Sequence, residues 1–153
     1  MWVPPEDVDP VVLHAPTRKN VGVFGAVCTA DGRLTTCRAE KFNAETFLSF
    51  LQQLVRRRRK GRKMVVVLDN ARWHRAKLLH PWLKKNRKHL RLDFLPPNSP
   101  ELNAIERVWK LTRRLRTHNR YFPLLDDLVQ TVFDQFDSWR KPNETLRRLC
   151  AII

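Results

Sequence analysis

The feature of the sequence that most constrains the fold is a short apolar run that ends in an acidic residue: Met64-Val65-Val66-Val67-Leu68, followed by Asp69. A continuous apolar run of this length is typical of a strand that is buried on both faces of a parallel sheet. Open α/β sheets carry their chemistry just beyond the carboxyl ends of such strands. The run therefore predicts an α/β fold with Asp69 at the position where a functional site is expected.

A second acidic residue, Glu106, follows a proline-punctuated loop that begins at Leu95-Pro96-Pro97. We expect this loop to open a helix near Glu101, with Glu106 in the second turn. Glu106 comes four residues after Leu102 and three before Trp109, so it lies at the edge of an apolar stripe and faces the sheet. Two carboxylates brought together in a strongly basic chain indicate metal-assisted chemistry on a phosphodiester.

Composition limits the class of partner. The 153 residues are enough for one domain, which we assign to 1–153, and the 42% of hydrophobic residues can supply a core. The formal net charge of +15 favours nucleic acid as the partner. A membrane surface is the weaker alternative, because no apolar run approaches the roughly 18 residues of a membrane span. Met1-Trp2-Val3 leads into prolines and acidic residues and not into a signal peptide, so we expect an intracellular protein.

The remaining pattern predicts alternating strands and helices. We expect a hairpin with a two-residue Asp31-Gly32 turn, which would place Cys37 opposite Ala26. The three cysteines lack a metal-binding spacing and are interpreted as unbridged thiols. The expected elements are strands over 21–28 and 34–40, a helix capped by Asn43 that ends at Gly61, a strand over 64–68, a helical stretch over 75–88 interrupted at Pro81, a strand over 90–95, and helices from 101, over 124–139 and after Pro142.

Two segments together resemble a known family. They are Leu68-Asp69-Asn70-Ala71-Arg72-Trp73-His74-Arg75-Ala76 and Leu95-Pro96-Pro97-Asn98-Ser99-Pro100-Glu101-Leu102-Asn103-Ala104-Ile105-Glu106-Arg107-Val108-Trp109. Both are similar to motifs of the DDE transposases of the mariner superfamily, in its bacterial insertion-sequence branch. The 36 residues between Asp69 and Glu106 fall within the range that this family uses. Asn98 and Ala104 depart from the pattern, which usually has an aromatic residue and a proline there.

The resemblance implies a ribonuclease H-like fold, a mixed central sheet flanked by helices, in which three carboxylates converge. Asp69 would be the second of these and Glu106 the third. The first lies, in the family, on the opening strand, shortly before a tryptophan like Trp2. Because this chain begins at that tryptophan, we expect the carboxy-terminal part of a transposase, without the first strand, the first catalytic Asp and the amino-terminal DNA-reading helices.

The family's reaction is metal-dependent DNA strand cleavage and strand transfer, with two Mg²⁺ or Mn²⁺ ions in the complete parent enzyme. Asp69 and Glu106 would be catalytic metal ligands here, with Asn70 and His74 beside them. Two carboxylates fit one weak metal site and not a paired one, so we expect this chain alone to be inactive. Taken singly, Asp69-Asn70 could be a turn, Glu106 an edge-of-helix residue and His74 an ordinary first-turn histidine.

Basic side chains are the candidates for contact with the DNA backbone, at transposon ends and target alike. Their runs could also be solvated helix ends. The expected partners include a second copy or an intact transposase, and the expected location is the bacterial cytoplasm at the nucleoid. The alternatives are a non-catalytic DNA-binding domain, a truncated regulator that inhibits an intact transposase, and a ribonuclease or junction resolvase on the same fold. The candidate DNA contacts are Arg56, Arg57, Arg58, Arg59, Arg113, Arg114 and Arg116.

Overall fold

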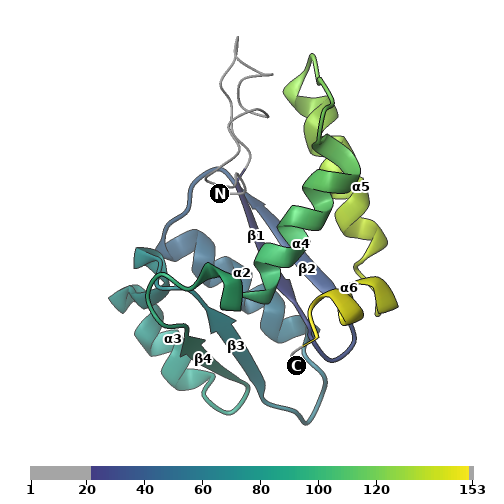
Figure 1. Ribbon diagram of the computed structural model, residues 1–153. Coiled ribbons are helices and arrows are strands. Elements are labelled where there is room, and N and C mark those ends of the chain that lie inside the picture. The colour runs from purple at the N-terminus through teal and green to yellow at the C-terminus, as the bar shows by residue number, and fades with distance from the viewer. Residues whose placement is uncertain (1–21, 152–153) are drawn as a thin grey trace. The chain divides into compact units, whose positions relative to one another are not determined.

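The computed structural model describes residues 22–151, which form two compact units (Figure 1). Unit 1 joins two separate stretches of chain, up to Glu40 and from Ala104 onward. Unit 2 is the continuous stretch Lys41–Asn103 between them. The expectations for Trp2 and for the opening of the first strand at Val21 lie outside the described residues. No helix in the 22–151 range is long and apolar enough to cross a membrane.

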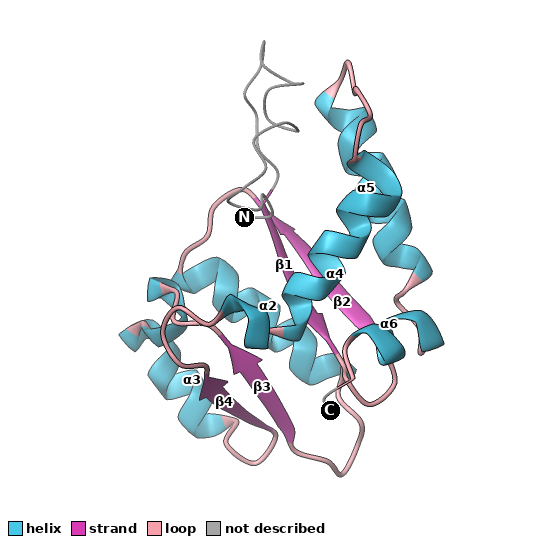
Figure 2. Cartoon of the chain, in the orientation of Figure 1, coloured by secondary structure: helices cyan, strands magenta, loops and turns pink. Residues whose placement is uncertain are grey.

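Unit 1 consists of a hairpin and a group of helices (Figure 2). The hairpin strands are antiparallel, and the helices that follow Ala104 supply most of the core. Five side chains at its centre are Leu34, Val108, Trp109, Phe136 and Leu146. The elements are β1 (Gly22–Val27), β2 (Leu34–Ala39), α4 (Ala104–Thr112), the π-helical turn η4 (Arg113–Thr117), α5 (Leu125–Ser138) and α6 (Glu144–Leu149).

The hairpin has a longer loop than the sequence predicts. Cys37 lies opposite Phe24 and not opposite Ala26, so the predicted register is wrong. The Cys28 N–H donates to the Arg33 carbonyl at 2.8 Å, which leaves four residues in the loop instead of two. Gly32 supplies the left-handed backbone that this loop requires, with φ of 82°. Both hairpin cysteines are free thiols, as expected.

Unit 2 contains a parallel pair of strands and the helices that connect them. Met64 lies opposite Leu90, and Leu68 opposite Phe94. Asn43 caps the first helix as predicted, because its side chain accepts from the Thr46 N–H at 2.9 Å. The elements are α2 (Ala44–Arg57), β3 (Met64–Leu68), the 3₁₀ turns η1 (Arg72–Arg75) and η2 (Lys77–Leu79), α3 (His80–Lys85), β4 (Leu90–Phe94) and the 3₁₀ turn η3 (Pro100–Leu102).

Strand β3 is buried on one face only, so the prediction of burial on both faces is wrong. Val65 and Val67 are 46% and 51% exposed, whereas Leu68 is buried. Successive residues of a strand point to opposite faces of the sheet, so the alternation marks one covered and one open face. Within residues 22–151, β3 pairs with β4 alone and β1 with β2 alone. The described strands thus form two two-stranded sheets in place of the single mixed sheet that was expected.

Three helix boundaries also differ from the prediction. Helix α2 ends at Arg57, where Arg58 turns to extended backbone, and Gly61 lies in the turn beyond it. Helix α4 begins at Ala104 and not near Glu101, because Asn103 is extended, with φ of −92° and ψ of 111°. Glu106 therefore lies in the first turn of its helix and not in the second. The 75–88 stretch divides at Ala76, and Pro81 stands in the first turn of α3, where no backbone N–H is needed.

Candidate active site

Asp69 is the first residue after β3, at the carboxyl end of the parallel pair in unit 2. The Leu95 N–H donates to the Leu68 carbonyl at 2.8 Å, so the pairing of the two strands continues to this end. The Asp69 side chain is 59% exposed. The location predicted from the apolar run is therefore the observed one, a carboxylate presented to solvent from the end of an ordered strand.

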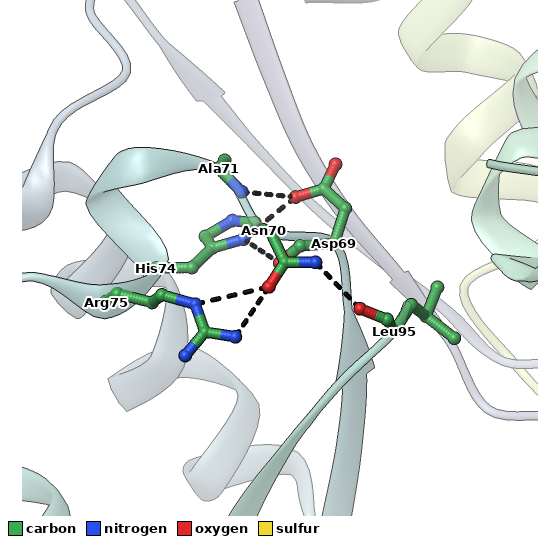
Figure 3. A network of polar contacts seen from close by, with 6 residues as sticks. All are labelled: Asp69, Asn70, Ala71, His74, Arg75 and Leu95. Atoms are coloured by element: carbon green, nitrogen blue, oxygen red, sulfur yellow. Dashed lines mark hydrogen bonds and ion pairs between the residues drawn. The ribbon is translucent and has the colours of Figure 1, made fainter. Parts of the chain in front are cut away.

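One oxygen of the Asp69 carboxylate is held by two partners (Figure 3). The Ala71 N–H donates to Oδ1 at 3.1 Å, and the Nδ1 of His74 lies 3.0 Å from Oδ1 and 3.0 Å from the Asp69 carbonyl oxygen. Both of these oxygens only accept, so Nδ1 of His74 carries the hydrogen. Figure 3 shows the second carboxylate oxygen turned away from both partners.

The same contacts set the ionisation of Asp69. The hydrogen bond from His74 is the main reason that the pKa of Asp69 lies below its ordinary value, and the Ala71 N–H lowers it further. Partial burial acts in the opposite direction and is outweighed. Asp69 is therefore a carboxylate at neutral pH, with one oxygen fixed and one available.

The His74 ring is fixed by aromatic side chains of the same unit. Its centroid lies 4.4 Å from the ring of Phe47, on α2, and 5.9 Å from that of Trp73. Trp73 in turn stacks on Phe42 at 5.6 Å. The His74 side chain is only 12% exposed. Helix α2 thus places the imidazole that orients the carboxylate.

Asn70 ties the Asp69 turn to the end of the neighbouring strand. Its Nδ2 donates to the Leu95 carbonyl at 2.7 Å, and its Oδ1 accepts from Arg75 Nη2 at 2.6 Å and Nε at 3.2 Å (Figure 3). The Arg75 guanidinium lies 3.9 Å from the centroid of the Phe94 ring. Arg75 was not among the predicted site residues, because its partners include Phe94 on another strand. The only local signal is its place five residues after Asn70.

We expect the His74→Ala variant (H74A) to raise the pKa of Asp69 toward the ordinary value of an aspartate, because the main hydrogen bond that stabilises the carboxylate is lost. A ¹³C NMR titration of the Asp69 carboxyl measures this directly. A group whose pKa is lowered on folding stabilises the fold above its unfolded-state pKa, and this stability is lost as pH falls through the folded-state value. The part of the loss in unfolding free energy of H74A that depends on pH should therefore disappear at low pH. The exposed His80 is the control, and H80A should leave the pKa of Asp69 unchanged. An equal rise of that pKa in H80A would contradict the assignment.

Glu106 belongs to unit 1, in the first turn of α4, and is half-buried. The buried residues Val108 and Trp109 anchor this helix in the unit 1 core. The structure thus brings Asp69, Asn70 and His74 together within unit 2, and places Glu106 in the other unit. Within residues 22–151 there is no cluster of three or more His, Cys, Asp or Glu side chains placed to hold a metal ion.

The seven arginines predicted to contact DNA differ in how exposed their side chains are and in whether they already make hydrogen bonds. Arg56 and Arg57 lie in the last turn of α2 and Arg59 beyond it, whereas Arg58 folds back so that its Nη1 donates to the Val55 carbonyl at 2.9 Å. In unit 1, the half-buried Arg116 donates from Nε to Gln135 Oε1 at 2.7 Å. Arg113 is half-buried as well, and Arg114 is exposed.

Comparison with known proteins identifies the family. Residues 1–129 match the model of the DDE superfamily endonucleases. The uncharacterized protein y4pE/y4sA of Sinorhizobium fredii (strain NBRC 101917 / NGR234) is 36% identical over 107 residues, which are 70% of this chain and 76% of that protein. The insertion element IS630 uncharacterized 39 kDa protein of Shigella sonnei is 26% identical over 108 residues, 71% of this chain but only 31% of that protein.

Solved structures show the same fold. The catalytic domain of the Mos1 mariner transposase superposes with a TM-score of 0.63 at 15% identity, over 85% of this chain and 67% of that one. The same domain solved with raltegravir and Mg gives 0.62, and the Mos1 strand transfer complex gives 0.61 over 38% of its chain. The expected ribonuclease H-like fold class is therefore confirmed. The chain belongs to the DDE superfamily endonucleases.

Proposed function

We propose that Asp69 and Glu106 are two of the carboxylate ligands of a metal centre that serves DNA strand cleavage and strand transfer. The observation that carries this proposal is the Asp69 carboxylate itself. It is ionised, it stands at the carboxyl end of a parallel strand, and one oxygen is fixed by Ala71 and His74 while the other faces away. Carboxylates that bind metal ions are themselves commonly held in place by hydrogen bonds from neighbouring groups.

The donor chemistry fits a hard divalent cation. Mg²⁺ and Mn²⁺ prefer carboxylate oxygens, and Mg²⁺ is usually held by one or two protein carboxylates together with water. Asp69 and Glu106 would hold the ion, which in this class of reaction activates the attacking oxygen and stabilises the leaving one. His74 holds the Asp69 carboxylate in one orientation, and Asn70 with Arg75 fixes the turn that carries it.

We further propose that the 153-residue chain by itself does not cleave DNA. In this proposal Asp69 and Glu106 would provide ligands for one ion, whereas this class of reaction commonly uses two. Purified protein incubated with Mn²⁺ and plasmid bearing the transposon ends should leave the DNA uncut. Mn²⁺-dependent nicking that Asp69→Ala abolishes would overturn this part of the proposal.

The metal ligands are tested separately, by Mn²⁺ binding followed by electron paramagnetic resonance. We expect one weak site per chain, lost in Asp69→Ala and in Glu106→Ala. Glu101→Ala, which removes an exposed carboxylate from η3, is the matched control and should bind as the wild type does. Retention of the site in Glu106→Ala would show that Glu106 does not share the ion, and would refute the pairing.

DNA is the proposed partner, because the family acts on DNA and the chain carries a net charge of +15. The exposed Arg114 and the arginines at the end of α2 are proposed backbone contacts, and a DNA partner would place the protein at the bacterial nucleoid. A second candidate is a regulator that pairs with an intact transposase and inhibits it, and it is favoured by the finding that residues 22–151 hold no group of three or more His, Cys, Asp or Glu placed to bind a metal ion. Stoichiometric inhibition of a full-length relative by this chain would identify that role.

A further inference from the structure

The positive charge of the chain is concentrated in unit 2. The Lys41–Asn103 stretch holds 16 Lys and Arg against 4 Asp and Glu, a net +12 of the chain's +15. No acidic residue occurs in the sequence between Glu45 and Asp69, or between Asp69 and Asp93. The cations of this unit therefore have few acidic neighbours along the chain to neutralise them.

Two basic segments of unit 2 meet at one edge of its sheet. Strands β3 and β4 are parallel and in register from their first residues, and the Met64 N–H donates to the His89 carbonyl at 2.8 Å. The turn before β3 and the turn before β4 consequently lie side by side, at the lower end of unit 2 in Figure 1. Each turn is basic. We name as the basic edge their exposed cations Arg59, Lys60, Arg62, Lys63, Lys84, Lys85, Arg87 and Lys88.

The turn before β4, together with α3, lines a hollow of about 520 Å³. Its lining consists of Pro81 and four cations, Lys84, Lys85, Arg87 and Lys88. Within the described residues, none of these four cations takes part in an ion pair. Lys84 and Lys85, in the last turn of α3, also offset the helix dipole, but Arg87 and Lys88 lie beyond the helix. A concave, unneutralised set of cations is suited to a polyanion backbone.

The basic edge is distinct from the candidate active site. Asp69 follows the carboxyl end of β3, and Lys63 precedes its amino end. The six residue steps between them correspond to about 20 Å of extended chain, at roughly 3.3 Å per residue. Along duplex DNA, 20 Å is about six base pairs at 3.4 Å per step. A phosphate bound at the basic edge is therefore not the one that would react at Asp69.

We propose that the basic edge is a second DNA-backbone site, which holds duplex DNA through its phosphates and without base readout. This goes beyond the proposed metal centre, since it requires neither Asp69 nor Glu106. Exposed lysine and arginine side chains contact phosphates without selecting sequence, and each neutralised phosphate steepens the dependence of binding on salt.

The test is binding of a fluorescent duplex of arbitrary sequence in EDTA, over a series of salt concentrations. The variant K84Q/K85Q/R87Q/K88Q should bind about tenfold or more weakly at low salt, and the slope of log affinity against log salt should fall by about 2–4. The variant R38Q/R140Q/K141Q/R148Q removes four exposed cations from unit 1 and is the charge-matched control. An equal loss in both variants would mean that net charge alone attracts DNA, and would overturn the proposal.

Three further variants complete the experiment. K84R/K85R/K88R retains the charges and should bind as the wild type does, which separates loss of charge from loss of fold. Asp69→Ala and Glu106→Ala should not weaken binding in EDTA, so failure of the metal centre and failure of the basic edge appear in different variants. Unchanged affinity and slope in the quadruple glutamine variant would refute the second site.

Discussion

The Gly32→Ala variant is expected to lose much of the stability of unit 1. A Cβ at Gly32 would overlap the Asn143 carbonyl oxygen and lie 2.7 Å from the Arg147 nitrogen, and both of these are backbone atoms that cannot rotate away. The left-handed φ of 82° costs about 1–2 kcal/mol for an L-residue, and the overlap adds about 1–3 kcal/mol. Chemical denaturation followed by circular dichroism measures the sum.

Gly61 provides the matched control for this prediction. Its φ of 78° is nearly the same as that of Gly32, but a Cβ there would meet nothing within 4 Å. Gly61→Ala should therefore show only the backbone cost. If the two substitutions were equally destabilising, the packing of the 28–33 loop against the start of α6 would not be as described.

The Trp109→Ala variant is expected to cost about 3–5 kcal/mol, the usual range for removing a buried tryptophan. The Trp109 side chain is buried in the unit 1 core, and its ring lies 5.5 Å from that of Phe136. The free energy of unfolding from urea titration measures the loss. Leu115, which is 50% exposed, is the control, and Leu115→Ala should be nearly neutral.

A double-mutant cycle tests the same packing from its other side. The Trp109 ring covers Gly25 of β1 so closely that a Cβ there would overlap Cη2 and lie 2.6 Å from Cζ2. Gly25→Ala should therefore be destabilising in the wild type. It should cost much less beside Trp109→Phe, because phenylalanine lacks those two ring atoms. Additive effects in the cycle would contradict the contact.

Elements specified by nearby residues are the ones that the sequence predicts well. Helix α5 runs from Leu125 to Ser138, within one residue of the expected ends, because its apolar stripe is continuous. The Asn43 cap is confirmed because its partner Thr46 lies three residues away. Asp69 was placed correctly for the same reason, since the strand that presents it is encoded in the five residues before it.

Features held by distant residues could not be predicted. The hairpin loop is fixed by Asn143, whose N–H donates to the Asp31 carbonyl and whose Nδ2 donates to the Gly32 carbonyl, both at 2.9 Å. Nothing near Asp31-Gly32 in the sequence indicates a partner 111 residues away, so the commoner two-residue turn was preferred. The contact of Arg75 with Asn70 and Phe94 was missed for the same reason.

The discontinuity of unit 1 has a consequence for the order in which a newly made chain folds. Proteins are synthesised from the amino end, and contacts between distant residues must wait until both partners have emerged. The Leu34 N–H donates to the Trp139 carbonyl at 2.9 Å, so β2 gains this partner only after the segment that carries Trp139 has emerged. The continuous Lys41–Asn103 unit has no such delay. On the ribosome, the turn that carries Asp69 can take shape while the helix that bears Glu106 has yet to be translated.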